Sequence, residues 1–281
     1  MQLIKVSIIR LLIFWSYSPF LVLTSDKNYG TFQFSETFKK SILSSRFSIL
    51  NIMLGAYTCY FFTYDISNKK FNFVEIKSLN KLYEEDKHVI DITNKYFIHL
   101  EEMPSEEVIE TEKEFLKYKI ESEEKRTVSS NTKINLYATI ILTVLPIVIA
   151  LIDLKQFLEM NWLGKLLIFI IVYGLLNIIC YIFQSISIQF IQRSTFNDLK
   201  QSSDHLLKLN SLYYYDWQMF KRKADLAVSY VKNIQYWFYF VTFFLTILFI
   251  YSMLLRYNAI DSSPEDVEKV LINLQVKLKV I

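Results

Sequence analysis

The sequence predicts an all-α membrane protein with three transmembrane helices, long cytoplasmic helical extensions and room for one small β-hairpin. Composition is the first observation behind this prediction. Hydrophobic residues make up 52% of the 281-residue chain and charged residues only 21%, whereas a soluble domain carries about 25% charge. The mean hydropathy of +0.24 points the same way. The second observation is that three long stretches of the chain lack any charge, and they set the expected fold.

The three uncharged stretches are 134–152, 166–192 and 233–255, with 19, 27 and 23 residues. A helix rises about 1.5 Å per residue, so roughly 20 residues cross a hydrocarbon core about 30 Å thick. We therefore expect a transmembrane hairpin over 134–192 and a third transmembrane helix over 233–255.

Two weaker segments lie in an N-terminal hydrophobic region, 1–64, and would raise the number of spans to five if both crossed. Segment 11–25 follows Lys5 and Arg10 and fits either a signal peptide or an N-terminal anchor. Segment 47–64 is uncharged but contains several polar residues and tyrosines. It fits a further span or a buried hairpin strand or core helix, and both alternatives stay open.

Lysine and arginine counts set the expected topology. Segment 65–133 holds twelve cations and 193–232 holds seven, whereas the loop 153–165 between the first two spans holds two. The positive-inside rule then places 65–133, a mostly helical region, and 193–232, a helical stalk, in the cytoplasm. An amphipathic tail, 256–281, completes the chain. The expected location is the inner (plasma) membrane, with several spans and the bulk of the polar regions cytoplasmic.

Local signals place further elements. Ser105 is a plausible N-cap, with Glu106 and Glu107 in the first turn of the helix that follows. We expect that helix to break near 128–132. Segment 71–76 favours a short strand. In the tail, a Ser-Pro-Glu-Asp run at 263–266 favours a helix start, and the alternating pattern over 274–280 fits a short closing strand equally well.

Catalytic and metal chemistry find little support. The chain has two cysteines and three histidines, and it lacks a phosphate-binding glycine loop, a nucleophile elbow and paired-cysteine zinc spacing. We therefore expect no enzyme activity, no catalytic residue, no metal site and no cofactor. The net charge of +3 is too small to predict direct nucleic-acid binding.

Polar side chains recur at helical spacing within all three spans, which indicates that one side of each helix avoids lipid. They either line a pore, in particular if several copies assemble, or form hydrogen bonds in helix packing. No Asp, Glu, Lys or Arg lies inside these spans, which argues against a proton relay or an ion-coupled carrier. The pore-lining candidates are Asn135, Thr139, Thr143, Asn177, Tyr181, Gln184, Tyr239, Thr242 and Thr246.

A second group of candidates lies in the stalk, where aromatic residues adjoin cations. Stacked rings beside cations can hold a nucleotide base and its phosphate. They can equally pack the stalk helices or contact anionic headgroups. The candidate residues for a cytoplasmic ligand or partner are Tyr214, Trp217, Lys221, Arg222 and Lys223.

The plan from Ser105 to Asn233 resembles the SLATT-like two-transmembrane effector domains of bacterial anti-phage and nucleotide-signalling defence systems. The matching parts are the charged run 112–116, the membrane hairpin and the run 203–207, Ser-Asp-His-Leu-Leu. They cover just under half of the chain, and the third span and the N-terminal region depart from the pattern.

The resemblance implies a homo-oligomer that permeabilises or depolarises the bacterial inner membrane when a cytoplasmic sensor protein or nucleotide signal triggers it, as in abortive infection. Its other expected partner is the lipid bilayer. Two alternatives stay open, namely a membrane-anchored scaffold that binds a partner and a housekeeping channel or transporter component.

Overall fold

The computed structural model describes residues 2–24, 46–66, 68–79, 86–102, 105–151, 161–186 and 205–261. Most of these residues are helical, but four strands form an antiparallel sheet in the order β1-β2-β3-β4. The expected all-α fold is therefore wrong. The elements are α1 (Gln2–Trp15), β1 (Phe20–Thr24), β2 (Arg46–Leu54), β3 (Tyr57–Asp65), β4 (Lys70–Ser78), α2 (Asp86–Glu101), α3 (Glu106–Leu151), α5 (Trp162–Ile186) and α7 (His205–Asp261).

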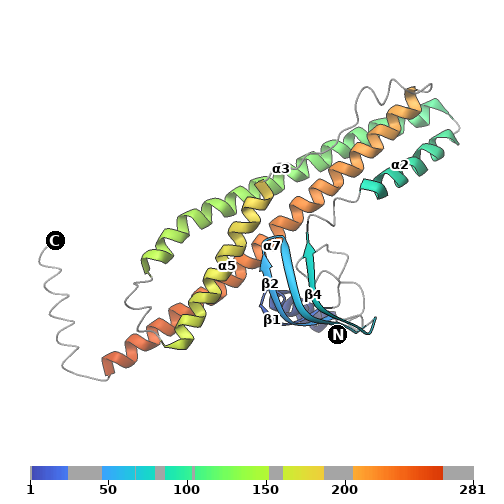
Figure 1. Ribbon diagram of the computed structural model, residues 1–281. Helices are drawn as coiled ribbons and strands as arrows, with labels where there is room; N and C mark the ends of the chain where they lie inside the picture. Colours follow the sequence, from blue (N-terminus) through green and yellow to red (C-terminus); the bar gives the residue numbers. More distant parts are fainter. Residues whose placement is uncertain are drawn as a thin grey trace, which may run out of the picture.

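Two very long helices, α3 and α7, lie side by side and run in the same direction (Figure 1). Near their starts, the Asn210 side chain donates a hydrogen bond to the carbonyl of Ile109. Further along, Arg126 of α3 pairs with Asp225 of α7 at 2.8 Å. Helix α2 packs beside the first part of α7. We call α2 together with residues 106–133 and 205–232 the rod.

Helix α5 packs antiparallel to α7 beyond the rod. At one end Tyr251 of α7 donates a hydrogen bond to Asn161, just before α5 begins. In the middle of α5, a Cβ atom on Gly174 would lie 2.4 Å from Cγ2 of Val241. Only a glycine therefore allows this close approach. The main hydrophobic core lies where α5 and α7 meet the end of the sheet that holds Met53, Ala56 and Leu79, and it includes Ile134 and Ile141 of α3.

Among the described residues, two helices, α5 and α7, are long and apolar enough to cross a membrane by length and composition. The prediction of three spans is therefore wrong, and the wider multi-pass scheme is not supported. The predicted first span, 134–152, is the end of α3. This part of α3 contains Pro146 and packs beside α7, with Ile134 and Ile141 buried in the main hydrophobic core.

The N-terminal region forms the sheet. Segment 47–64 is the β2–β3 hairpin, so the strand alternative is confirmed and the membrane-span alternative is wrong. The Leu54–Tyr57 pair closes a two-residue loop with Gly55 at φ +58°, a conformation that glycine adopts without steric cost. The predicted strand at 71–76 is confirmed within β4. Segment 11–25 divides between the end of α1 and β1, so it is not one anchoring helix.

Helix α3 begins at Glu106, as the Ser105 cap predicts. The expected break near 128–132 is wrong, because no glycine or proline interrupts this part. Ser130 and Thr132 instead donate their hydroxyls to carbonyls four residues earlier in the same helix. Helix α7 joins the predicted stalk and third span in one 57-residue helix. The predicted tail helix lies outside the described residues.

Candidate functional site

The polar residues that helical spacing places on one side of α5 form the candidate site. We call Tyr173, Asn177, Tyr181 and Gln184 the α5 stripe. Asn177 and Tyr181 are completely buried. The β2–β3 hairpin, more than 100 residues earlier in the chain, bonds to Tyr173, Asn177 and Gln184, while the ring of Tyr181 packs against Tyr230 of α7.

The hairpin contacts the stripe through its backbone. The N–H of Met53 donates to the hydroxyl of Tyr173 at 2.9 Å. The N–H of Gly55 donates to Oδ1 of Asn177 at 3.0 Å, and the N–H of Ala56 donates to Oε1 of Gln184 at 2.5 Å. These three bonds satisfy backbone donors that would otherwise be buried without a partner.

Gly55, at the tip of the hairpin, lies in very close contact with α5. A Cβ atom at this position would lie 2.5 Å from Oε1 of Gln184 and 2.9 Å from Cβ of Cys180. Both distances are shorter than any ordinary contact, and the positive φ of Gly55 independently disfavours other residues. The candidate site therefore depends on Gly55. A search of the sequence for polar residues would not select this glycine.

The turn between α1 and β1 supports the other side of the hairpin. Asn51 donates its backbone N–H to the carbonyl of Pro19 at 2.8 Å and its side-chain N–H to the carbonyl of Ser16 at 3.2 Å. Tyr17 donates its hydroxyl to Oδ1 of Asn233 on α7 at 2.9 Å, and both residues are buried. The hairpin is therefore held between α5 and a turn that is itself bonded to α7.

We call the contact between the β2–β3 hairpin and α5 the junction. Not every buried polar group at the junction has a hydrogen-bond partner. Three buried side-chain oxygens at or beside it have no hydrogen-bond partner among the described residues: Oδ1 of Asn51, Oγ1 of Thr58 and the hydroxyl oxygen of Tyr181. A buried polar group without a partner costs about 1–3 kcal/mol. Because these groups regain partners on contact with water, they lower the free energy needed to separate the hairpin from α5.

The other predicted pore-lining residues are not part of this junction. They lie on exposed faces of α3 and α7, and three of the threonines donate their hydroxyls to carbonyls four residues earlier in their own helix. Gln235 donates to the hydroxyl of Tyr239. The exposed candidates are Asn135, Thr139, Thr143, Tyr239, Thr242 and Thr246.

The predicted cytoplasmic ligand residues lie along α7 in the rod, where their rings pack against the same chain. Tyr214 stacks on Tyr96 of α2 with ring centroids 4.2 Å apart. Trp217 lies edge-on to Tyr214, and the ammonium group of Lys221 lies 5.7 Å from its ring centre. The predicted Arg222 and Lys223 follow on the same helix and are half-buried. These ring contacts join α2 to α7.

Hydrogen bonds and ion pairs between side chains change the pKa values of several groups in the rod. Tyr96 donates its hydroxyl to Glu112 at 2.6 Å, and burial together with this carboxylate raises the pKa of Tyr96 well above its usual value. On the surface of α3, the hydrogen bond from Lys117 lowers the pKa of Glu114. Within the described residues, no group of three or more His, Cys, Asp and Glu could hold a metal ion.

Comparison with known proteins assigns neither a family nor a function to this chain. No protein-family model, curated protein or solved structure matches this chain.

Proposed function

We propose that the chain is a membrane effector in which α5 and α7 cross the bacterial inner membrane and the β2–β3 hairpin keeps the α5 stripe closed. Release of the hairpin would expose the stripe and permeabilise the membrane. The observation that carries this proposal is the set of three hydrogen bonds from hairpin backbone to Tyr173, Asn177 and Gln184, on a helix apolar enough to cross a membrane.

The exposure of α7 supports its place in lipid. In the most apolar 18-residue part of α7, only 17% of the residues are buried, and Phe249, Ile250 and Met253 are all exposed. In water each Å² of such surface would cost about 25 cal/mol, and an apolar surface that continues along a helix is typical of contact with lipid or a partner.

Release of the hairpin would remove the hydrogen-bond donors that now pair with Tyr173, Asn177 and Gln184. In hydrocarbon, each unpaired polar group costs several kcal/mol. Asn177 and Gln184 would therefore need water or the matching residues of other copies as new partners, and an oligomer around an aqueous path provides both. The exposed Thr242 and Thr246 of α7 are available to line such a path.

The rod is the part that a trigger would bind. Helix α7 runs without interruption from the rod to its apolar end, so a change in its packing against α3 reaches Asn233, the partner of Tyr17. The trigger is a cytoplasmic sensor protein or nucleotide signal, as the resemblance to defence effectors implies.

Two variants separate this function from alternatives. Gly55→Ala displaces the hairpin but leaves the stripe intact, so its expression in a bacterial host should depolarise the membrane and lower colony counts beyond the wild type. Asn177→Leu with Gln184→Leu loses both the docking bonds and the polar stripe and should be harmless at equal membrane expression. If both variants leave the membrane potential unchanged, the permeabilising function is wrong.

One observation favours a second function, that of a membrane-anchored scaffold. Val108, Phe115 and Tyr118 of α3 are exposed apolar residues at helical spacing on the rod. A scaffold would bind a partner there, and the partner should co-purify with the wild type but not with Phe115→Glu, while neither protein changes the membrane potential.

A further inference from the structure

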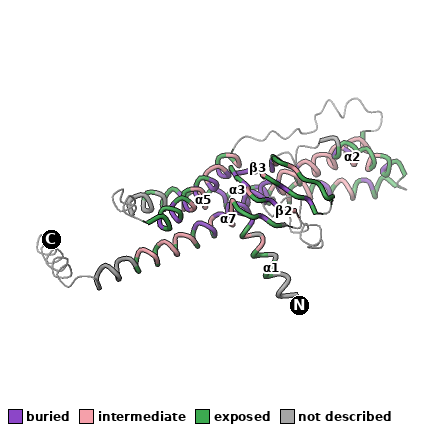
Figure 2. Tube along the Cα trace, turned by 60° about the horizontal axis from the view of Figure 1, so that its bottom comes forward, coloured by how far each residue is buried: buried purple, intermediate pink, exposed green. Residues whose placement is uncertain are grey.

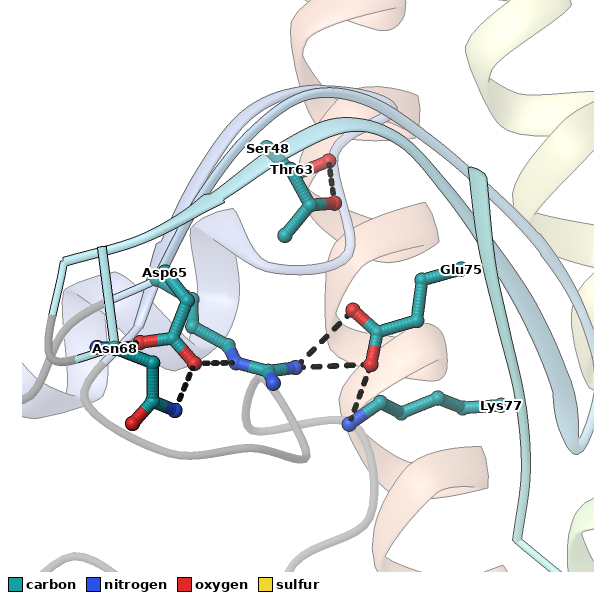
Figure 3. Close-up of polar contacts among 7 residues, drawn as sticks. Ser48, Thr63, Asp65, Asn68, Glu75 and Lys77 are labelled. Atoms are coloured by element: carbon teal, nitrogen blue, oxygen red, sulfur yellow. Dashed lines mark hydrogen bonds and ion pairs between the residues drawn. The ribbon is translucent and has the colours of Figure 1, made fainter. Parts of the chain in front are cut away.

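The two faces of the sheet have the reverse of the usual polarity. Its inner face carries a network of charges, in which Arg46 pairs with Asp65 and with Glu75, both at 3.1 Å, and Lys77 lies 3.5 Å from Glu75 (Figure 3). All four side chains are largely buried. In an ordinary antiparallel sheet with one solvated face, charges of this kind lie on the solvent side.

The outer face is apolar and exposed. The residue pairs on either side place four apolar residues, one from each strand, in a row across the sheet: Leu21, Ile49, Phe62 and Phe73. Ile52 and Ile76 extend the apolar surface beside this row. Phe62 on the central strand β3 is 44% exposed, and Phe73 and Ile76 on the edge strand β4 are 69% and 70% exposed, so the structure leaves large apolar side chains uncovered at the centre and at the edge of the sheet.

The backbone is strained where this row crosses the sheet. Leu21 and Phe62 have φ values of +52° and +53°, which bulky residues rarely adopt. The alternation of buried and exposed residues changes phase at the same place: Ser48 and Asn51 of β2 are both buried, although they are three residues apart. The strained backbone keeps the row around Phe62 apolar on the outer face.

The sheet is attached at the level where the apolar part of α7 begins. Tyr17, next to the sheet, bonds to Asn233, the first residue of the uncharged stretch. Phe14 of α1 lies 5.5 Å from the ring of Phe240 and 5.8 Å from that of Phe243. If α7 crosses a bilayer, this level is the boundary between headgroups and hydrocarbon.

Helix α1 and the β3–β4 turn fit the same boundary. Helix α1 projects from the rest of the chain as a separate arm (Figure 2), with Ile8, Leu11 and Trp15 exposed and Arg10 exposed beside them. Lys69 and Lys70 are exposed at the turn. Cations on long side chains that reach from an apolar surface to headgroups are typical of interfacial segments.

We propose that the outer face of the sheet, together with α1, lies in the headgroup–hydrocarbon boundary of the membrane that α5 and α7 cross. The occupant of the face is lipid, because the face adjoins the apolar part of the chain and carries cations at its rim. This inference rests on the membrane location in the proposed function but not on permeation.

A fluorescent label that reports its surroundings tests the position of the face. In a Cys59→Ala, Cys180→Ala background, an environment-sensitive dye is attached to Phe73→Cys or, as a second site on the same face, to Ile76→Cys. Phe249→Cys on α7 serves as the membrane reference and Lys95→Cys on α2 as the aqueous reference. The proteins are reconstituted into vesicles of phosphatidylethanolamine and phosphatidylglycerol, with a lipid-borne spin quencher or with aqueous iodide.

The proposal predicts that lipid quencher reduces emission at positions 73, 76 and 249, and that iodide reduces it at position 95. Quenching at 73 and 76 by iodide alone would place the face in water and overturn the inference. Protection from both quenchers, with disulfide-linked dimers of unlabelled Phe73→Cys, would assign the face to a second copy and also overturn it. Lack of lipid quenching at position 249 would contradict the membrane location itself.

Discussion

Replacement of Gly55 by alanine is the sharpest perturbation that the structure offers, because it acts on the junction through one methyl group. The new Cβ atom would lie 2.5 Å from Oε1 of Gln184 and 2.9 Å from Cβ of Cys180. The Gln184 side chain can turn away, but the Cβ atom of Cys180 is fixed to the backbone of α5, so the hairpin must move as well. Either movement breaks the bond from Ala56, and a shift of the hairpin tip also breaks the bond from Gly55 to Asn177.

The magnitude follows from these terms. An L-residue in the left-handed conformation costs about 1–2 kcal/mol, and two lost hydrogen bonds cost about 1 kcal/mol each. The sum is about 3–4 kcal/mol of weaker docking. Since 1.4 kcal/mol is a factor of ten, separation of the hairpin from α5 should be roughly 100 to 1,000 times more populated.

Hydrogen–deuterium exchange of the reconstituted protein measures this population. The amides of residues 53–56 should exchange faster in Gly55→Ala by about the same factor, while amides of the rod stay unchanged. Leu54→Ala is the matched control, because its side chain is exposed and makes none of the docking bonds. Equal protection of residues 53–56 in Gly55→Ala and wild type would refute the reasoning.

Three further predictions concern the supports of the junction and the rod. Tyr17→Phe leaves Oδ1 of Asn233 buried without a donor and should lower the free energy of unfolding by about 1–3 kcal/mol, measured by denaturant titration; no change would mean that the bond is not formed. Gly174→Ala places a Cβ against Val241 and should lower the melting temperature, and added Val241→Ala should restore it if the clash is the cause. The hydrogen bond from Lys117 lowers the pKa of Glu114 in the folded protein. Glu114 therefore contributes fully to the stability of the rod above the unfolded pKa of about 4.3, and this contribution is lost as pH falls through the lower folded value. Thermal melting followed by circular dichroism should show a fall in melting temperature between about pH 5 and pH 3 that is smaller in Glu114→Gln.

The helical parts of the fold could be predicted from the sequence because their signals are local. The N-cap at Ser105 and the charge-free stretches marked the start of α3 and the apolar parts of α5 and α7. The continuity of α7 was harder to predict, because the change from a charged to an apolar segment resembles a boundary between elements. In the structure no glycine or proline interrupts the helix from His205 to Asp261.

The sheet could be predicted only in part because its polarity is reversed. In segment 47–64, Asn51, Thr58 and Thr63 belong to the buried face, whereas Ile52 and Tyr57 are exposed. This mixture of polar and apolar residues is equally typical of a membrane span that contains some polar side chains. The local feature that distinguishes the two is Gly55 in the middle of the segment, which allows the tight turn of the hairpin.

Helical spacing correctly placed Asn177 and Gln184 on one side of α5, but it could not identify their partner. The hairpin backbone that bonds to them lies 122 and 128 residues away in the chain. Backbone donors of a distant turn leave no pattern near α5, so the stripe could only be assigned to a pore or to helix packing. The structure adds docking of a sheet to these uses.

The most direct test of the central claim, that the hairpin keeps the α5 stripe closed, is the conductance of purified protein in a planar lipid bilayer. We predict that wild type is largely silent and that Gly55→Ala conducts, while Gly55→Ala combined with Asn177→Leu and Gln184→Leu is silent again. A silent Gly55→Ala protein whose hairpin amides exchange fast would contradict the claim, because the stripe would then be free without opening a path.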